Sequence, residues 1–141
     1  MKRFFVIILL ILVVSACSKE EEQKLQLSAP EAFAYDVGGS WELHVTTIAK
    51  GFSQKKSFAK YAAKLSYTLD LITPSNDTLK ALVSGVEERS EAEPLEDLEL
   101  EAQADLDSTY TTGKYECIFK VNDKLSGQTA TVKKVLKLGE N

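Results

Sequence analysis

Apolar side chains recur at every second position over long parts of the chain after residue 40. The clearest runs are Trp41, Leu43 and Val45, then Tyr61, Ala63, Leu65, Tyr67, Leu69 and Leu71, and finally Tyr115, Cys117, Phe119 and Val121. Because successive side chains of a β-strand point to opposite faces, this period predicts strands with one buried face. No long helix is expected in this part of the chain.

The pattern predicts seven strands. They are expected at residues 24–28, 40–49, 61–72, 78–85, 96–106, 114–122 and 128–138. Turn-forming residues such as Thr73-Pro74-Ser75-Asn76-Asp77 separate them, because Pro fixes φ and Asn and Asp support tight bends. The last two strands, joined across loop 122–127, are predicted to form a hairpin. Seven short strands spaced in this way predict an all-β fold, an antiparallel β-sandwich.

Two segments fit more than one secondary structure. Residues 53–65 place Phe58, Tyr61 and Leu65 at helical spacing, so a short helix or a turn is expected before the third strand. Residues 95–106 fit a strand, but their Glu, Leu, Ala and Gln content also favours a helix. A strand is preferred there, because a meander of strands around the segment needs its edge filled.

The N-terminus has the composition of a secretory signal. Lys2 and Arg3 precede eleven apolar residues at 4–14, followed by small residues and a cysteine. Eleven residues as a helix reach about 16 Å, short of the roughly 30 Å hydrocarbon core of a bilayer. A basic start, a short apolar core and a small-residue exit are typical of a signal peptide rather than a permanent transmembrane helix.

The segment Val14-Ser15-Ala16-Cys17 resembles the lipobox of bacterial lipoproteins. The resemblance implies a signal peptide at 1–16, cleavage before Cys17, and acyl chains such as palmitate on that cysteine, which anchor the protein to the membrane. Residues 17–24 are then the lipidated cysteine with a polar tether, and 25–141 the folded domain. Ser18 resembles the sorting residue of outer-membrane lipoproteins and the following Lys-Glu-Glu a surface-export tag, which favours the outer membrane, at its periplasmic or surface face, over the inner one.

Composition excludes several classes of function. The formal net charge is −4, which argues against a nucleic-acid partner. One His and two Cys leave too few ligands for a zinc or iron–sulfur site, and no cofactor motif is present. With Cys17 acylated, Cys117 is the last free thiol, so no internal disulfide is expected. Its place in an alternating strand predicts a buried, inert thiol.

The segment Gly113 to Gly127 resembles the F–G hairpin of bacterial immunoglobulin-like and fibronectin-III-like modules, which share the order Gly-x-Tyr, alternating strand, Asp and a Ser-Gly loop. The resemblance implies an immunoglobulin-like sandwich. It places Tyr115 at the tyrosine corner, whose hydroxyl binds the chain just upstream, and makes Trp41 a candidate inter-sheet aromatic. Cys117 has no partner cysteine, unlike the cysteines of antibody domains.

Candidate catalytic or metal residues are few. His44 is the only histidine and has no recognisable catalytic partners, so no enzyme activity is expected. Residues 87–107 are acidic, with eight Asp or Glu between 87 and 101 against Arg89 alone. We expect a solvated edge that prevents strand-to-strand aggregation. The alternative is a cation site, in which Asp105 and Asp107 lie near Asp123.

A cluster of lysines suggests contact with a polyanion. Five of them occur between Leu43 and Leu69 without an acid, interleaved with aromatic residues; they are Lys50, Lys55, Lys56, Lys60 and Lys64. A solvated loop is the simpler interpretation, and binding to anionic lipid or to an envelope polymer is the functional one. Leu125 and the turn at 73–78 are further places where a sandwich could display a binding surface.

Together these features predict a lipid-anchored lipoprotein of the cell envelope that acts as a non-catalytic binding or structural module. Its partners are expected to be the membrane, through acylated Cys17, and an envelope protein or polyanionic polymer. A small cation- or ligand-binding lipoprotein that uses the acidic 87–107 segment is the alternative. The modules that the domain resembles share a fold and not a chemistry, so they predict no specific activity.

Overall fold

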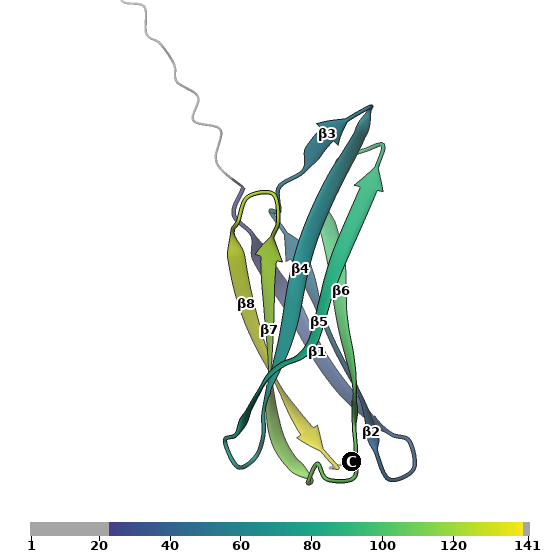
Figure 1. Cartoon of the computed structure of the whole chain (residues 1–141), viewed down its shortest axis with the longest axis vertical. Helices are drawn as coiled ribbons and strands as arrows, with labels where there is room; N and C mark the ends of the chain where they lie inside the picture. Colours follow the sequence, from purple (N-terminus) through teal and green to yellow (C-terminus); the bar gives the residue numbers. More distant parts are fainter. Residues whose placement is uncertain (1–22, 140–141) are drawn as a thin grey trace, which may run out of the picture.

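The computed structural model describes residues 23–139 of the chain, which form eight β-strands. The strands are β1 (Gln26–Asp36), β2 (Trp41–Lys50), β3 (Lys55–Ser57), β4 (Lys60–Ile72), β5 (Thr78–Glu91), β6 (Asp97–Leu106), β7 (Gly113–Asp123) and β8 (Thr129–Leu138) (Figure 1). No helix among the described residues is long and apolar enough to cross a membrane.

The strands form two antiparallel sheets. One sheet has the order β1-β2-β6; in the other, β4 lies between β5 and β7, and β8 follows β7. The short β3 pairs with the first residues of β4, on the side away from β5. The prediction of an all-β antiparallel sandwich is confirmed, with eight strands in place of about seven.

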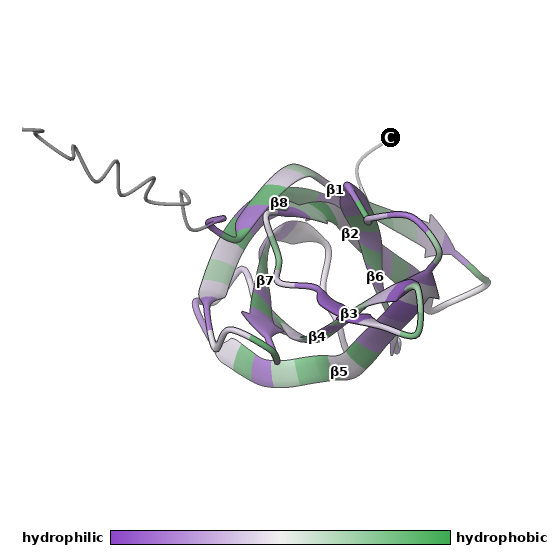
Figure 2. Cartoon of the chain, turned by 90° about the horizontal axis from the view of Figure 1, so that it is seen from above, coloured by the Kyte–Doolittle hydropathy of each residue, from purple (hydrophilic) through white to green (hydrophobic). Residues whose placement is uncertain are grey.

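The core lies between the two sheets and follows the alternation in the sequence. Seen from above, the strands surround it, and hydrophobic and hydrophilic residues alternate along them (Figure 2). The largest fully buried side chains are Tyr115, Phe52, Phe119, Leu43, Leu65, Leu69, Leu71, Leu100, Leu106, Leu138, Val45 and Val121. Both sheets contribute to this set, so burial of one face of each stabilises the pair.

Two predicted strands are too short. The first was expected at 24–28, but β1 extends to Asp36. Ala32 and Ala34 point toward the core, while Phe33 and Tyr35 face solvent, so the usual apolar-in, polar-out contrast is absent. The fourth was expected to end at 85, but β5 runs to Glu91. Its last residues are charged and exposed, which is tolerated on the outer strand of a sheet.

The structure decides both ambiguous segments. Residues 97–106 form strand β6, as preferred, with Leu98, Leu100 and Ala102 buried. The helical alternative for 53–65 is wrong, because this segment turns between β3 and β4 at Phe58 and Ala59. The hairpin of the last two strands is confirmed, as β7 and β8 pair from Gly113 opposite Leu138 to Asn122 opposite Thr129.

Candidate functional site

The outer face of the β1-β2-β6 sheet carries two exposed aromatic side chains beside a charged cluster. Phe33 and Tyr35 on β1 are 50% and 56% exposed. The strand register sets Phe33 opposite His44 of β2 and Tyr35 opposite Glu42. We call this surface, formed by Phe33, Tyr35, Glu42, His44 and Glu101, the aromatic–acidic face.

His44 lies at the centre of the cluster and contacts a carboxylate with each ring nitrogen. Its Nδ1 is 2.8 Å from Oε1 of Glu101 on β6, and its Nε2 is 2.7 Å from Oε1 of Glu42. The side chain of Gln103, next to His44 in the β2–β6 register, donates to the same Glu42 oxygen. Tyr35 packs edge-on against the imidazole, with ring centroids 5.5 Å apart.

The two carboxylates favour the protonated form of His44. Hydrogen bonds to Glu101 and then to Glu42 raise the pKa of the imidazole above its ordinary value, despite partial desolvation. The bonds from His44 and Gln103 correspondingly lower the pKa of Glu42. An imidazolium can donate from both nitrogens at once, which matches this geometry. When His44 is protonated, the cluster holds one positive charge between two negative ones, and both ring nitrogens donate to carboxylates.

The acidic 87–107 segment does not converge on a cation site in the described residues. It lies along the end of β5, the following loop and β6, and no three Asp, Glu, His or Cys side chains in residues 23–139 are placed to hold a metal ion. Some of these acids have basic partners instead. Glu87 pairs with Arg89 and Glu88 with Lys64, each at 2.8 Å.

The expected approach of Asp105 and Asp107 to Asp123 is wrong. Asp107 lies in the β6–β7 loop, where it binds Thr109, and Asp123 ends β7. The ten residue steps from Gly113 to Asp123 separate these ends by about 33 Å of strand. Buried Asp123 binds the Ser53 N–H at 2.6 Å and the Leu125 N–H at 2.9 Å, so it organises local backbone.

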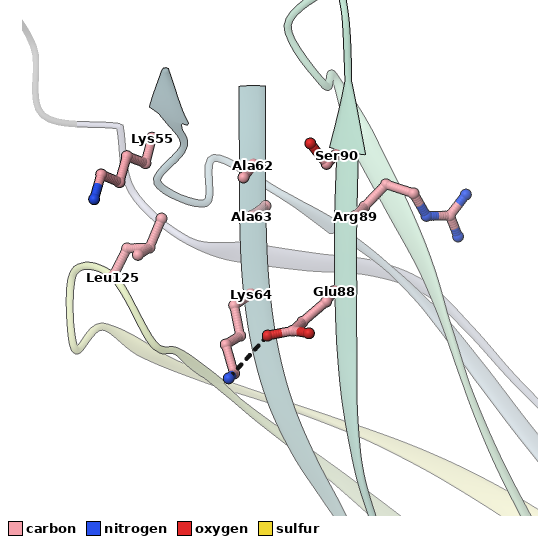
Figure 3. Close-up of a pocket in the computed structure, with 8 residues that line it drawn as sticks. All are labelled: Lys55, Ala62, Ala63, Lys64, Glu88, Arg89, Ser90 and Leu125. Atoms are coloured by element: carbon pink, nitrogen blue, oxygen red, sulfur yellow. Dashed lines mark ion pairs between the residues drawn. The ribbon is translucent and has the colours of Figure 1, made fainter. Parts of the chain in front are cut away.

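Of the five clustered lysines, Lys50 ends β2 and Lys64 lies farther along β4, whereas the other three lie at the β3–β4 hairpin. Lys55, Lys56 and Lys60 are exposed there, and Lys56 lies 5.3 Å from the ring centroid of Tyr61. Phe58, at the tip, is fully exposed at 101%, whereas Phe52 is buried in the core. Lys55, Lys64 and Leu125 surround a hollow of about 290 Å³ over Ala62 (Figure 3). The 73–78 turn lies at the other end of the strands, beside Tyr115.

The three residues expected to have structural roles are placed as follows. The Tyr115 hydroxyl donates a 2.6 Å hydrogen bond to the carbonyl of Thr111, four residues upstream. Cys117 is 1% exposed, and burial raises the pKa of its thiol to about 12. Trp41 begins β2 and is partly buried, at one end of the core rather than at its centre. Cys17 lies outside the described residues.

Sequence reasoning missed Phe33 and Tyr35 as surface residues. The only available signal was the order Ala-Phe-Ala-Tyr at residues 32–35, which has period two but is apolar at both parities. Hydrophobicity alone assigns the larger side chains to the core. The strand packs closely over the core, so its inward positions hold the small side chains of Ala32 and Ala34, and the larger Phe33 and Tyr35 face solvent.

Comparison with known proteins finds a lipid attachment site at the N-terminus. Residues 1–18 match the model for a prokaryotic membrane lipoprotein lipid attachment site. The chain is therefore a lipid-anchored lipoprotein of the cell envelope. Among curated proteins, none matches it. A solved X-ray structure, of Northeast Structural Genomics Consortium target SoR45, is similar over 83% of this chain and 87% of that one, with 14% identity and a TM-score of 0.44.

Proposed function

We propose that this lipoprotein is a non-catalytic binding module that recognises an envelope protein through its aromatic–acidic face. The observation that carries the proposal is the exposure of Phe33 and Tyr35, side by side on β1, next to the acids that hold His44. About half of each ring is exposed to solvent and free to contact a partner, and exposed aromatic side chains are enriched where proteins contact one another.

The chemistry of this face favours a partner segment that carries Lys or Arg side chains. Glu99, Glu101 and Asp105 are exposed on β6, on the same outer face as His44. A cationic side chain can lie over an aromatic ring while its charge meets a carboxylate. Such a contact combines apolar burial with charge complementarity, which gives specificity more than raw affinity.

A binding role fits the architecture that we propose for the domain, an immunoglobulin-like module. Pairing of β1, β2 and β6 in one sheet and of β4, β7 and β8 in the other matches the A-B-E and C-F-G arrangement of such sandwiches. The bond from Tyr115 to Thr111 has the geometry of a tyrosine corner. Modules of this architecture serve many functions, so the surface rather than the fold carries the proposal.

Site-specific photo-crosslinking in cells tests the proposal. A photoreactive amino acid replaces Tyr35 in one variant and Phe33 in another. The matched control position is Val135, which is 42% exposed on β8 of the other sheet. We expect a discrete cross-linked protein from positions 33 and 35 that is absent from position 135. No product at either β1 position, or the same products at all three, would contradict the proposal.

A further inference from the structure

We propose that the tip of the β3–β4 hairpin inserts Phe58 into the anionic phospholipid bilayer that carries the protein's own anchor. The inference depends on the lipid anchor and not on the aromatic–acidic face. An experiment can therefore contradict this inference without contradicting the proposed function, and the reverse also holds.

The hairpin lies at the end of the sandwich from which the tether leaves. The Leu25 N–H donates to the side chain of Gln128 in the β7–β8 loop, and Gly51, just after β2, lies close against the backbone of Lys24. Figure 1 shows the start of β1 and the β3–β4 hairpin at the same end of the domain. Only eight residue steps separate Cys17 from Leu25, which limits their separation to about 28 Å. This end is therefore held close to the membrane.

Folding supplies no reason for a phenylalanine at position 58. Ser57 pairs with Lys60, so Phe58 and Ala59 form a two-residue turn, with φ values of 48° and 59°. Turns of this kind favour Asn and Gly, because a side chain strains the backbone at positive φ. The Phe58 side chain is also fully exposed. A residue that is unfavourable both to the backbone and to solvation is best explained by a contact outside the domain.

The charges around the tip match a surface of lipid phosphates. Lys55, Lys56 and Lys60 flank Phe58, and no acid lies within the paired residues 55–62 of the hairpin. Below it, Lys55 and Lys64 line the hollow together with Glu88 and Arg89, and the Arg89 side chain extends to the side away from Lys55 (Figure 3). Lysines near an anionic membrane strengthen binding, and an apolar side chain among them adds insertion.

Acidic side chains also occur at this end of the domain. An anionic bilayer repels them, so the tip of the hairpin rather than the whole end is expected to contact the lipid. Glu88 is paired with Lys64, but Glu91, Glu93 and Glu96 are exposed at the end of β5 and in the loop that follows it. In Figure 1 the hairpin extends beyond this loop along the long axis of the domain. The tip can thus reach the lipid phosphates while the acids remain farther out.

Tryptophan fluorescence in vesicles tests the insertion. Trp41 is the only tryptophan of the chain, and it lies at the opposite end of β2 from Lys50 and the tether. The mature lipoprotein carrying Phe58→Trp and Trp41→Phe is reconstituted into vesicles of phosphatidylglycerol and phosphatidylethanolamine with brominated acyl chains. We expect a blue shift and quenching of the emission from position 58. Both effects are expected to weaken in vesicles of phosphatidylcholine alone.

Matched variants test whether quenching is specific to position 58 and whether it depends on the lysines of the hairpin. Phe33→Trp with Trp41→Phe moves the probe to the aromatic–acidic face, and the unchanged protein reports Trp41; neither is expected to be quenched. Replacing Lys55, Lys56 and Lys60 by Gln is expected to abolish the difference between anionic and zwitterionic vesicles. The same change at three β8 lysines, Lys133, Lys134 and Lys137, is expected to leave it intact.

Two outcomes would overturn the inference. One is a tryptophan at position 58 that is no more quenched in anionic vesicles than one at position 33. The other is a blue shift at position 58 caused by dextran sulfate added to the protein in neutral detergent, with none in anionic vesicles. That second result would assign the hairpin to a soluble polyanion instead of a bilayer.

Discussion

Asp123 provides the sharpest test of how the sandwich is held together. Its carboxylate, at the end of β7, accepts hydrogen bonds from the N–H groups of Ser53 and Leu125, and Ser126 adds a longer contact at 3.4 Å. Burial raises the pKa of this carboxyl, but the hydrogen bonds outweigh burial and leave its pKa below the ordinary value. One side chain therefore joins the β2–β3 loop to the β7–β8 turn.

We predict that Asp123→Asn destabilises the domain by about 3 kcal/mol. The asparagine oxygen can still accept from Leu125, but an amide NH₂ group then faces the Ser53 N–H. Hydrogen bonds to charged groups are worth about 1.5–3 kcal/mol, and an unsatisfied buried donor costs about 1–3 kcal/mol more, with overlap between the two. For a domain of about 120 residues, 3 kcal/mol lowers the Tm by about 12 °C.

The assay is thermal unfolding of the mature lipoprotein in detergent at pH 7, followed by circular dichroism. Because the folded-state pKa of Asp123 is lowered, its contribution is fully present at pH 7 and is lost only as the pH falls through that value. Asp105→Asn, at an exposed position on β6, is the matched control and should change the Tm by about 2 °C or less. A Tm of the Asp123 variant equal to that of the control would refute the reasoning.

Four further predictions follow from single side chains. The Cys117 thiol, whose pKa burial raises to about 12, should not react with a disulfide reagent at pH 8 until urea unfolds the domain; prompt reaction would contradict its burial. His44 should titrate by NMR with a pKa above that of an unperturbed histidine, Glu101→Gln should lower this pKa, and the contribution of His44 to stability should be lost as pH rises through the folded-state value. Tyr115→Phe should lower the Tm by about 4 °C, since one buried hydrogen bond contributes about 1 kcal/mol. Phe58→Asn should raise the Tm by about 4 °C, because Asn tolerates positive φ. An unchanged Tm would show that Phe58 does not strain the backbone of the turn.

The strands that could be predicted are those with a large difference between their two faces. In β7, Tyr115, Cys117 and Phe119 alternate with mostly polar residues, and the structure buries all three. Strand β6 was preferred because the meander around it needs its edge filled, although its composition suits a helix. Pairing with β2 along its whole length outweighs that local preference.

Positions that depend on which strands meet could not be predicted. The contact between Asp123 and the Ser53 N–H joins residues 70 apart in the chain, and only the topology brings them together. The contact between His44 and Glu101 joins residues 57 apart in the chain, which no local pattern encodes. The lysine cluster was visible in the sequence, but its place next to the tether required the fold.

The attachment of β1 to the membrane determines how the domain responds to mechanical load. The anchor precedes β1, which pairs with β2 from Gln26 opposite Lys50 to Asp36 opposite Trp41. A pull between the bilayer and a partner held at the far end of the sandwich acts along this strand, not across it. The hydrogen bonds between β1 and β2 must then shear together instead of unzipping one at a time, so the strand nearest the anchor resists extraction when the envelope is stretched.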